Sequence, residues 1–260
     1  MSTPINPIIV IPARLASRRL PGKPLADIHG EPMIVHVWRR AVAAGIGPVL
    51  VACAEAEIAD AVDRAGGRAV LTDPGHASGS DRVREAVDLV DPDRQHDAVV
   101  NLQGDLPTLD PEIVRRVLDA LADPAVDIAT LAAVIRDEAE RTNPNVVKAV
   151  AAFAPGSRVA RALYFSRATV PWGEGDHYHH IGLYAFRREA LARFVRLPRG
   201  TLEGRERLEQ LRALEAGMRI DVALVDTVPL GVDTPAELAT ARALLARAPT
   251  RPMDHPKDRS

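Results

Sequence analysis

The sequence contains a single cysteine, Cys53, among its 260 residues. One cysteine excludes an intramolecular disulfide and every zinc motif that needs several cysteines. Cys53 ends an apolar run and is interpreted as a small buried hydrophobic residue. No stretch reaches about 18 consecutive apolar residues, and the N-terminus lacks a basic segment followed by a long apolar one. We therefore expect a cytoplasmic protein without a membrane-spanning or targeting segment.

An excess of one charge is also missing, because 33 Lys and Arg stand against 35 Asp and Glu. A formal net charge of -2 argues against nucleic acid or an anionic membrane as a partner, so any anion must be bound locally. Neither G-x-x-x-x-G-K-[ST] nor G-x-G-x-x-G occurs, which argues against a Walker loop and against a nicotinamide cofactor. Lysine stands only at positions 23, 148 and 257, so Lys23 is more informative than an arginine there.

The sequence does contain short apolar runs that alternate with segments of helical period, which is typical of βαβ units around a parallel sheet. The expected strands are 8–11, 49–53, 68–72, 98–103 and 128–135, and the expected helices are 32–44, 56–65, 79–90 and 111–122. The pattern then changes, since the strand-like segments 143–150, 161–172 and 179–186 are not separated by full helices. A helix over 202–217, a strand over 219–226 and a helix over 235–246 follow.

The length suits a single α/β domain with an elaboration. We expect one domain over residues 1–248, whose main part covers about 8–135 and 219–246. A mixed or antiparallel extension covers about 136–218. Residues 249–260 carry proline and charge without periodicity and are predicted to be a disordered tail.

Positive charge is concentrated in one loop directly after the first expected strand. Arg14, Arg18, Arg19 and Lys23 follow Pro12 within twelve positions, spaced mainly by small residues. Because ligands of open parallel sheets bind at the carboxyl ends of strands, these cations lie where a triphosphate would be bound. The alternative is a solvated basic loop without a ligand.

Two carboxylates stand at strand ends where no helix needs them as a cap. Asp105 follows the expected strand 98–103, but the next helix already has Asp110 as its N-cap. Asp233 precedes Thr234, which forms a capping box with Glu237. Such a carboxylate pair suits a hard divalent cation that also binds phosphate oxygens. Together with the cationic loop, the pair predicts Mg²⁺–nucleoside triphosphate chemistry; the alternative for Asp105 is a capping role.

Two further segments carry polar residues of interest. "HASGSDRVREAV" (76–87) predicts a helix with Ser78 as N-cap, and capping does not explain Gly79, which would let a ligand approach the helix N-terminus. "HYHH" (177–180) admits a zinc site, but no cysteine or carboxylate completes a set at ligand spacing. A polar substrate contact or a surface loop is the preferred interpretation of the histidines.

These segments together resemble a known family. "IPARLASRRLPGKPLADIHGEPMIVHVWRRA" resembles the opening of the 3-deoxy-manno-octulosonate (Kdo) cytidylyltransferases, also called CMP-Kdo synthetases. The similarity continues in order, over about residues 8 to 245, through "HASGSDR", "VNLQGDLP", "NPNVVKAV", "YFSRATVPW", "HHIGLYAFR", "LEQLRAL" and "VDTPAEL". It implies a Rossmann-like nucleotidyltransferase fold with a mostly parallel central sheet, and a homodimer. The implied reaction is CTP + Kdo → CMP-Kdo + pyrophosphate, with Mg²⁺ as cofactor, for lipopolysaccharide biosynthesis.

The resemblance also implies roles for individual residues, with the extension binding the sugar and forming the dimer. By motif, the triphosphate residues are Ala13, Arg14 and Lys23, and the cytidine residues are Ser78, Gly79, Arg82 and Gln103. The implied metal ligands are Asp105 and Asp233, which with Lys23 form the catalytic set. The sugar-acid positions are Arg167, His180, Tyr184, Glu209 and Gln210.

The sequence departs from the family pattern at several places. Leu106 stands where the family usually has Glu, Arg18 where it has a small hydroxyl residue, and Leu15 where Tyr is common. Cys53-Ala54 replaces a frequent Thr-Asp pair. The segment between Trp172 and His179 is shorter than usual. These departures leave open another sugar acid, such as 8-amino-Kdo or a sialic acid. They also leave open a non-catalytic nucleotide-binding paralogue, against which the retained Lys23, Asp105 and Asp233 argue.

Overall fold

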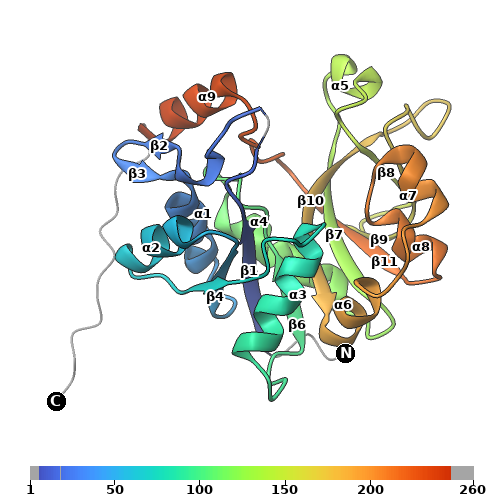
Figure 1. Cartoon of the computed structure of the whole chain (residues 1–260). Helices are drawn as coiled ribbons and strands as arrows, with labels where there is room; N and C mark the ends of the chain where they lie inside the picture. The colour runs from blue at the N-terminus through green and yellow to red at the C-terminus, as the bar shows by residue number, and fades with distance from the viewer. Residues whose placement is uncertain (1–5, 18, 247–260) are drawn as a thin grey trace.

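The computed structural model describes residues 6–17 and 19–246. Figure 1 shows a large twisted sheet with helices packed against it. The strands are β1 (Pro7–Ala13), β2 (Asp27–Ile28), β3 (Glu31–Pro32), β4 (Val49–Cys53), β5 (Ala69–Leu71), β6 (Ala98–Asn101), β7 (Ile128–Val134), β8 (Lys148–Ala151), β9 (Val159–Ser166), β10 (Tyr178–Arg187) and β11 (Ile220–Val225). The α-helices are α1 (Met33–Ala44), α2 (Ala56–Arg64), α3 (Gly79–Val90), α4 (Pro111–Arg116), α5 (Glu138–Thr142), α6 (Arg188–Phe194), α7 (Thr201–Glu206), α8 (Leu211–Glu215) and α9 (Pro235–Ala246). Two 3₁₀ helices are η1 (Lys23–Leu25) and η2 (Val117–Leu121).

The sheet has the strand order β5-β4-β1-β6-β10-β7-β11-β9-β8. Strands β5, β4, β1 and β6 are parallel neighbours, and β7 is parallel to β11. Strand β10 is antiparallel to both β6 and β7, so the strands on its two sides run the same way. This arrangement confirms the expected α/β fold with a mostly parallel central sheet and a mixed extension.

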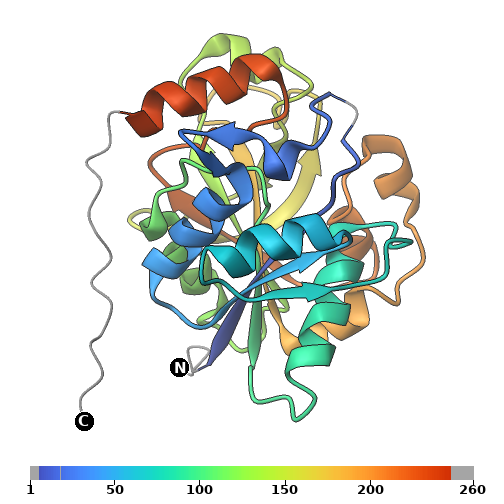
Figure 2. The ribbon, with the colours of Figure 1, turned by 60° about the vertical axis from the view of Figure 1, so that its left-hand side comes forward.

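Alternation along β1 sends side chains into two cores, one on each face of the sheet. Ile9 and Ile11 pack in the core that contains α1, α2 and α4. Ile8 and Val10 pack in the core that contains α3, α6 and α8. Both faces of β1 are therefore covered, which explains why its sequence is a continuous apolar run rather than an alternating one. The helices on the two sides of the strands are visible in Figure 2.

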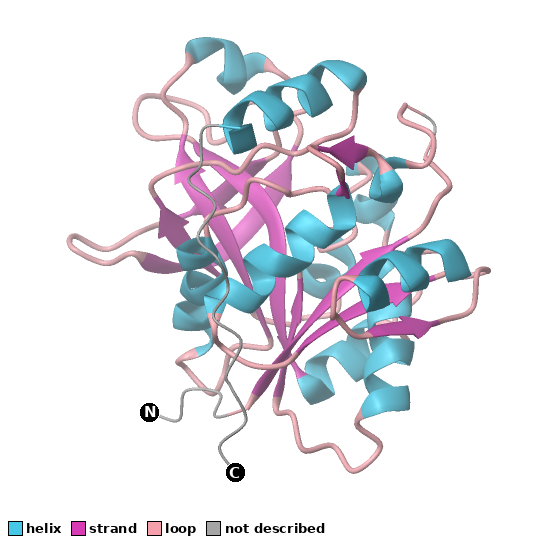
Figure 3. Ribbon diagram, turned by 90° about the vertical axis from the view of Figure 1, so that its left-hand side faces the viewer, coloured by secondary structure: helices cyan, strands magenta, loops and turns pink. Residues whose placement is uncertain are grey.

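Beyond β6 the sheet ends in a closed ring of five strands rather than in an ordinary edge, and the ring combines β7 and β11 of the main part with β8, β9 and β10 of the extension. Going round the ring, β10 pairs with β7, β7 with β11, β11 with β9, β9 with β8, and β8 again with β10. Strand β10 takes part in both the ring and the central sheet, and its register against β7 shifts between Ile181 and Tyr184. Such an irregularity bends a strand and redirects its side chains. Figure 3 shows the strands of the ring and of the central sheet diverging.

A third, smaller core connects the two ends of the chain. Its buried residues are Ile28, Met33, Val232, Leu238 and Ala241, so it joins the β2–β3 hairpin, the start of α1 and α9. The Arg242 side chain donates to the backbone oxygen of Asp27 at 2.6 Å, and the His29 ring contacts the Arg242 oxygen at 2.7 Å. Helix α9 lies directly over the hairpin (Figures 1 and 2). This core fixes the loop that precedes α9.

Several expected elements differ from the observed ones. The expected helix 111–122 is α4 followed by η2, and the expected strand 98–103 ends at Asn101. The expected strand 143–150 is confined to β8, and the expected strand 161–172 ends at Ser166. The expected helix 202–217 is interrupted between α7 and α8, because Arg207 adopts the left-handed conformation with φ 56°.

Two predictions concern the chain as a whole. The predicted disordered tail at 249–260 lies outside the described residues. Within 6–17 and 19–246, no helix combines the length and the apolar character needed to cross a bilayer.

Candidate active site

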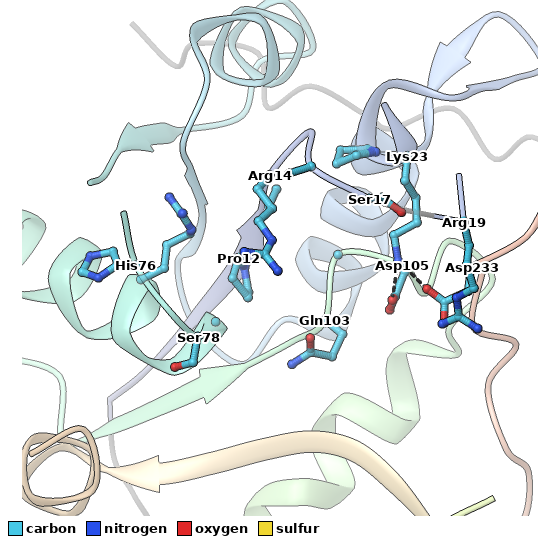
Figure 4. Close-up of a pocket in the computed structure, with 16 residues that line it drawn as sticks. Pro12, Arg14, Ser17, Arg19, Lys23, His76, Ser78, Gln103, Asp105 and Asp233 are labelled. Atoms are coloured by element: carbon cyan, nitrogen blue, oxygen red, sulfur yellow. Dashed lines mark hydrogen bonds and ion pairs between the residues drawn. The ribbon is translucent and has the colours of Figure 1, made fainter. Parts of the chain in front are cut away.

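A cavity of about 850 Å³ opens at the carboxyl ends of β1 and β6 (Figure 4). The loop after β1, the start of α3, the segment after β6 and the residue before Thr234 line it. All nine residues predicted from the motifs to contact CTP or the metal are among the lining residues: Ala13, Arg14, Lys23, Ser78, Gly79, Arg82, Gln103, Asp105 and Asp233. The structure therefore brings this predicted set together in one place.

At one end of the cavity, Lys23 joins the two predicted metal ligands. Its Nζ donates to Asp105 Oδ2 at 2.8 Å and to Asp233 Oδ1 at 2.9 Å. Arg19 donates to the other oxygen of Asp233 at 2.7 Å. Burial opposes the charge of Lys23, but the two carboxylates outweigh burial and hold the pKa of Lys23 above its ordinary value. Lys23 is therefore a charged ammonium at neutral pH.

Local backbone structure explains how Lys23 reaches this position. Gly22 precedes η1 with φ 66°, a left-handed conformation that glycine adopts without a steric penalty, and Pro24 occupies the first turn. Upstream, the backbone N–H of Leu15 donates to Glu55 Oε2 at 3.1 Å, which fixes the loop to the start of α2. The cationic loop is thus held at both of its ends.

The two carboxylate-bearing segments are also fixed to each other and to β1. The backbone N–H of Val232, the residue before Asp233, donates to the backbone oxygen of Asp105 at 2.9 Å. At Gly104, a Cβ atom would lie 3.0 Å from the Pro12 oxygen, so glycine permits the close approach of this segment to β1. The separation of Asp105 from Asp233 is therefore set by backbone contacts as well as by Lys23.

The donor set at this end fits a magnesium ion that is shared with phosphate. Two carboxylates reach the same ammonium group, so a cation placed between them would contact both. Over the described ranges there is no cluster of three or more His, Cys, Asp or Glu that could enclose a metal on its own. Mg²⁺ is commonly held by one or two carboxylates and completes its shell with substrate phosphates and water. Asp105 and Asp233 match that requirement.

The other end of the cavity is formed by the start of α3. Ser78 and Asp81 make the expected capping box, with Asp81 N–H donating to Ser78 Oγ at 3.2 Å. A Cβ atom at Gly79 would meet only the Pro12 side chain, at 3.5 Å, so packing within the protein does not require glycine there. Arg82 lies one turn further, buried, with its guanidinium against the Thr72 hydroxyl. The exposed helix N-terminus is available to an anionic or polar ligand.

None of the five predicted sugar-acid residues lines this cavity, but four of them (His180, Tyr184, Glu209 and its neighbour Gln210) form a cluster beside α3. Ser80 donates to Glu209 Oε2 at 3.0 Å, and the rings of His180 and Tyr184 lie 5.6 Å apart. Burial and the nearby charge of Glu209 raise the pKa of Tyr184. Burial, with a smaller effect from His179, lowers the pKa of His180 to about 3. Both rings are therefore neutral at physiological pH.

The bulged strand β10 orients His180. The His180 Nε2 atom lies 3.0 Å from the Thr130 hydroxyl, and that hydroxyl is also within hydrogen-bonding distance of the backbone oxygens of Ile181 and Leu183. Because a hydroxyl has one proton and the carbonyls only accept, His180 Nε2–H is the donor to Thr130. The bulge thus sets the tautomer of a predicted sugar-binding residue.

Two neighbouring polar atoms in the cluster lack hydrogen-bond partners. Glu209 Oε1 and Gln210 Nε2 are buried without a hydrogen bond, and burial raises the pKa of Glu209. Buried polar atoms normally find partners, so an open acceptor and an open donor on consecutive residues can bind water or a polar ligand. The fifth residue, Arg167, bonds instead to the backbone oxygens of Glu206, at 2.9 Å, and Pro144, at 3.0 Å.

Comparison with known proteins identifies the family. The sequence model of the cytidylyltransferase family matches residues 8–220 of this chain. The chain belongs to the cytidylyltransferase family. This assignment confirms the Rossmann-like nucleotidyltransferase fold and the resemblance found in the motifs.

Individual relatives of this cytidylyltransferase are similar over nearly their whole length. A 3-deoxy-manno-octulosonate cytidylyltransferase of Paramagnetospirillum magneticum is 71% identical over 93% of the chain and 98% of the relative. One from Rhodospirillum centenum is 72% identical over 94% and 95%. A CMP:2-keto-3-deoxy-manno-octonic acid synthetase solved in complex with CTP is 42% identical, with a TM-score of 0.84 over 93% of this chain and 98% of the other.

The cytidylyltransferase cavity also contains residues that the motif analysis did not assign. These are Pro12, Ala16, Ser17, Arg19, Pro24, His76 and Gly104. The imidazole of His76 pairs with the Glu85 carboxylate, which also accepts the Asp73 N–H at 2.9 Å. The sequence analysis noted Arg19 as part of the cationic loop and His76 as the start of the segment 76–87. Neither pattern shows which residues of the segment line the cavity.

The other two histidines of "HYHH", His177 and His179, have partners within the protein. His177 Nε2 lies 3.0 Å from the Pro171 oxygen, and His179 Nδ1 lies 3.3 Å from the Glu140 carboxylate. The last histidine of the segment, His180, belongs to the cluster beside α3. The segment thus contributes one ring to the predicted sugar site and two to local structure.

Proposed function

We propose that this cytidylyltransferase transfers CMP from CTP to the anomeric hydroxyl of Kdo and releases pyrophosphate. The observation that carries the proposal is the contact of Lys23 with both Asp105 and Asp233 inside a cavity lined by every predicted CTP residue. The relatives named as Kdo cytidylyltransferases are similar over more than nine-tenths of the chain, which supports the same substrate.

The reaction forms a bond between the sugar oxygen and the α-phosphorus, and it breaks the bond from that phosphorus to the β-phosphate. Negative charge moves toward the leaving pyrophosphate, while the attacking hydroxyl loses its proton. Arg14 and Lys23 line the cavity and supply fixed positive charge for the phosphates. Mg²⁺, when bound by Asp105 and Asp233, would polarise the phosphate and make the hydroxyl more acidic.

Lys23 and a divalent cation compete for the same two carboxylates. In the structure the ammonium group satisfies both of them, at 2.8 and 2.9 Å. Occupation of the carboxylates by the cation would release Lys23 for the triphosphate. The lysine thereby links the arrival of the metal to the binding of phosphate.

The cluster beside α3 supports binding of a polyhydroxylated acid. Glu209 Oε1 accepts hydrogen bonds and Gln210 Nε2 donates them, and both lack partners in the protein. Arg167 donates to backbone oxygens rather than to a carboxylate through its guanidinium, so its charge is available to the sugar carboxylate. His180 and Tyr184 would complete this side.

Pyrophosphate release tests the proposal. With CTP, Kdo and Mg²⁺, the full chain should release pyrophosphate, and ATP or GTP should replace CTP poorly. Faster release with 8-amino-Kdo or a sialic acid would transfer the assignment to that acid. Comparable turnover with ATP would contradict cytidine specificity. Binding of CTP without release from any of these acids would identify a non-catalytic paralogue.

We also propose that the protein is a homodimer through the extension and acts in the cytoplasm in lipopolysaccharide biosynthesis. The extension exposes Trp172 fully and Leu163 to 61%, and we expect these apolar side chains to be covered in the dimer. Sedimentation equilibrium should give twice the mass of the chain, and Trp172→Ser should weaken association without reducing CTP binding. A wild-type monomer at micromolar concentration would refute the dimer.

A further inference from the structure

Ser80 is a buried residue at the second position of α3, and it does not line the CTP cavity. Its hydroxyl donates to Glu209 Oε2 at 3.0 Å. Ser80 follows Ser78 and Gly79, which line the CTP cavity, whereas Glu209 comes from the segment between α7 and α8. This hydrogen bond therefore joins the helix at the nucleotide cavity to the predicted sugar site.

The contact uses one oxygen of Glu209 and leaves the other one open. Glu209 Oε1 is buried and makes no hydrogen bond, with Arg212 Nη2 3.7 Å away. The next residue, Gln210, is 5% exposed, and its Nε2 also lacks a partner. An unsatisfied buried carboxylate oxygen is costly unless a donor binds to it. A sugar hydroxyl is such a donor.

The orientation of the Glu209 carboxylate depends on its partners, because the terminal torsion of a glutamate has a broad rotational preference. Ser80 donates to Oε2 from α3, with Ser78 beside it, and this contact helps to set the direction in which Oε1 points. We propose that Ser80 is a positioning residue for the acceptor sugar: it orients Glu209 so that Oε1 accepts a sugar hydroxyl at a set place relative to the nucleotide. This inference rests on the proposed function, and it extends that function to a residue of the nucleotide helix.

Several polar and charged groups around Glu209 influence the charge of its carboxyl group. Ser78 and Ser80 on α3 stabilise the ionised carboxylate, Arg212 on α8 does so too, and Asp81 on α3 opposes them. Tyr184 on β10 lies close enough to respond to the same charge. Burial is the largest influence and raises the pKa of Glu209. Removal of the Ser80 hydroxyl should raise it further, since one hydrogen bond to the ionised form is lost.

The test compares Ser80→Ala with Ser80→Thr, which keeps a hydroxyl, and with Ser157→Ala as a control. Ser157 also makes a short hydrogen bond, to the Val159 oxygen at 2.7 Å, but it lies in the β8–β9 turn. In the pyrophosphate assay, Ser80→Ala should raise KM for Kdo about tenfold, the scale of one hydrogen bond to a charged group. KM for CTP should change less than twofold. Ser80→Thr and Ser157→Ala should resemble the wild type.

A second measurement does not depend on the substrate. Carbon-13 NMR of labelled glutamate carboxylates should show the Glu209 titration moving to higher pH in Ser80→Ala, and the acid limb of kcat/KM for Kdo should move with it. An unchanged Glu209 titration overturns the inference, as does an equal rise of KM for CTP and Kdo. If the wild type releases no pyrophosphate with Kdo, the proposed function fails, and the NMR result still decides whether Ser80 orients Glu209.

Discussion

Replacement of Lys23 by Met should make the stability of the nucleotide-free protein depend on Mg²⁺. Methionine keeps most of the length of the side chain but removes the ammonium group that contacts Asp105 at 2.8 Å and Asp233 at 2.9 Å. The two carboxylates then face each other with Arg19 as the remaining partner, and its side chain is 66% exposed. Their repulsion should lower stability until a divalent cation replaces the lost charge.

The magnitude follows from the exposure of the groups. Lys23 is 16% exposed, but Asp105 and Asp233 are 27% and 39% exposed, so solvent screens both contacts. Two such hydrogen bonds together contribute about 2 kcal/mol, equivalent to a fall in Tm of about 4–8 °C for a chain of this size. If Mg²⁺ binds the freed pair with a Kd of about 1 mM, 10 mM Mg²⁺ restores about 1.4 kcal/mol. In the wild type the ammonium group competes, and the shift should stay below about 1 °C.

The assay is thermal unfolding without nucleotide, in MgCl₂ and in KCl of matched ionic strength. The double variant Lys23→Met/Asp105→Asn is the control, since it lacks one ligand and should lose the Mg²⁺ response. In the pyrophosphate assay, Lys23→Met should lower kcat/KM by at least about 10²-fold, the scale of one charged transition-state contact. A Tm of Lys23→Met that ignores Mg²⁺, or a response that survives in the double variant, would refute the metal assignment.

Three further outcomes are expected. The His180 pKa is lowered to about 3, so the unfolded chain takes up a proton that the folded chain does not, and stability should fall as pH drops from about 6.5 towards 3. His180→Gln should flatten that part of a Tm–pH curve, and an unchanged slope would contradict the burial argument. Burial raises the pKa of Cys53 to about 11, so native protein at pH 8 should react with a thiol reagent only after denaturation. Arg19→Ala should lower kcat/KM less than tenfold, because its exposed ion pair is weak; a loss equal to that of Lys23→Met would refute this ranking.

The position of Asp105 and Asp233, the predicted metal ligands, could be anticipated from the sequence because helix capping is a local property. Asp110 and Thr234 cap their helices as expected, with Glu112 N–H donating to Asp110 at 2.9 Å and Glu237 N–H to Thr234 at 3.3 Å. Asp105 and Asp233 were therefore free for another role. The carboxyl-edge rule for parallel strands then places both beside the cationic loop. Their contact through Lys23 is tertiary, and no spacing in the sequence shows it.

The sugar side could not be derived in the same way. The helical period of 202–217 continues through the break at Arg207, which follows from tertiary contacts such as the ion pair of Glu203 with Arg212 at 2.6 Å. The pairing of β8 with β10 joins residues that lie far apart in the sequence, and the bulge in β10 leaves no sequence signal. The sugar-acid residues were indicated by family resemblance alone.

The small core around α9 has a consequence for the synthesis of the protein. Lys23 and Asp233 lie 210 positions apart, and the last described helix anchors the second carboxylate against the hairpin near the start of the chain. In the described part of the chain all eleven strands precede Asp233, so the central sheet can assemble on the ribosome before α9 emerges. A nascent chain would then possess the CTP loop, the α3 start and Asp105 but hold only half of its carboxylate pair. If the predicted carboxylate pair holds the metal, we expect a chain cut short before α9 to be inactive even though all the described strands precede that helix.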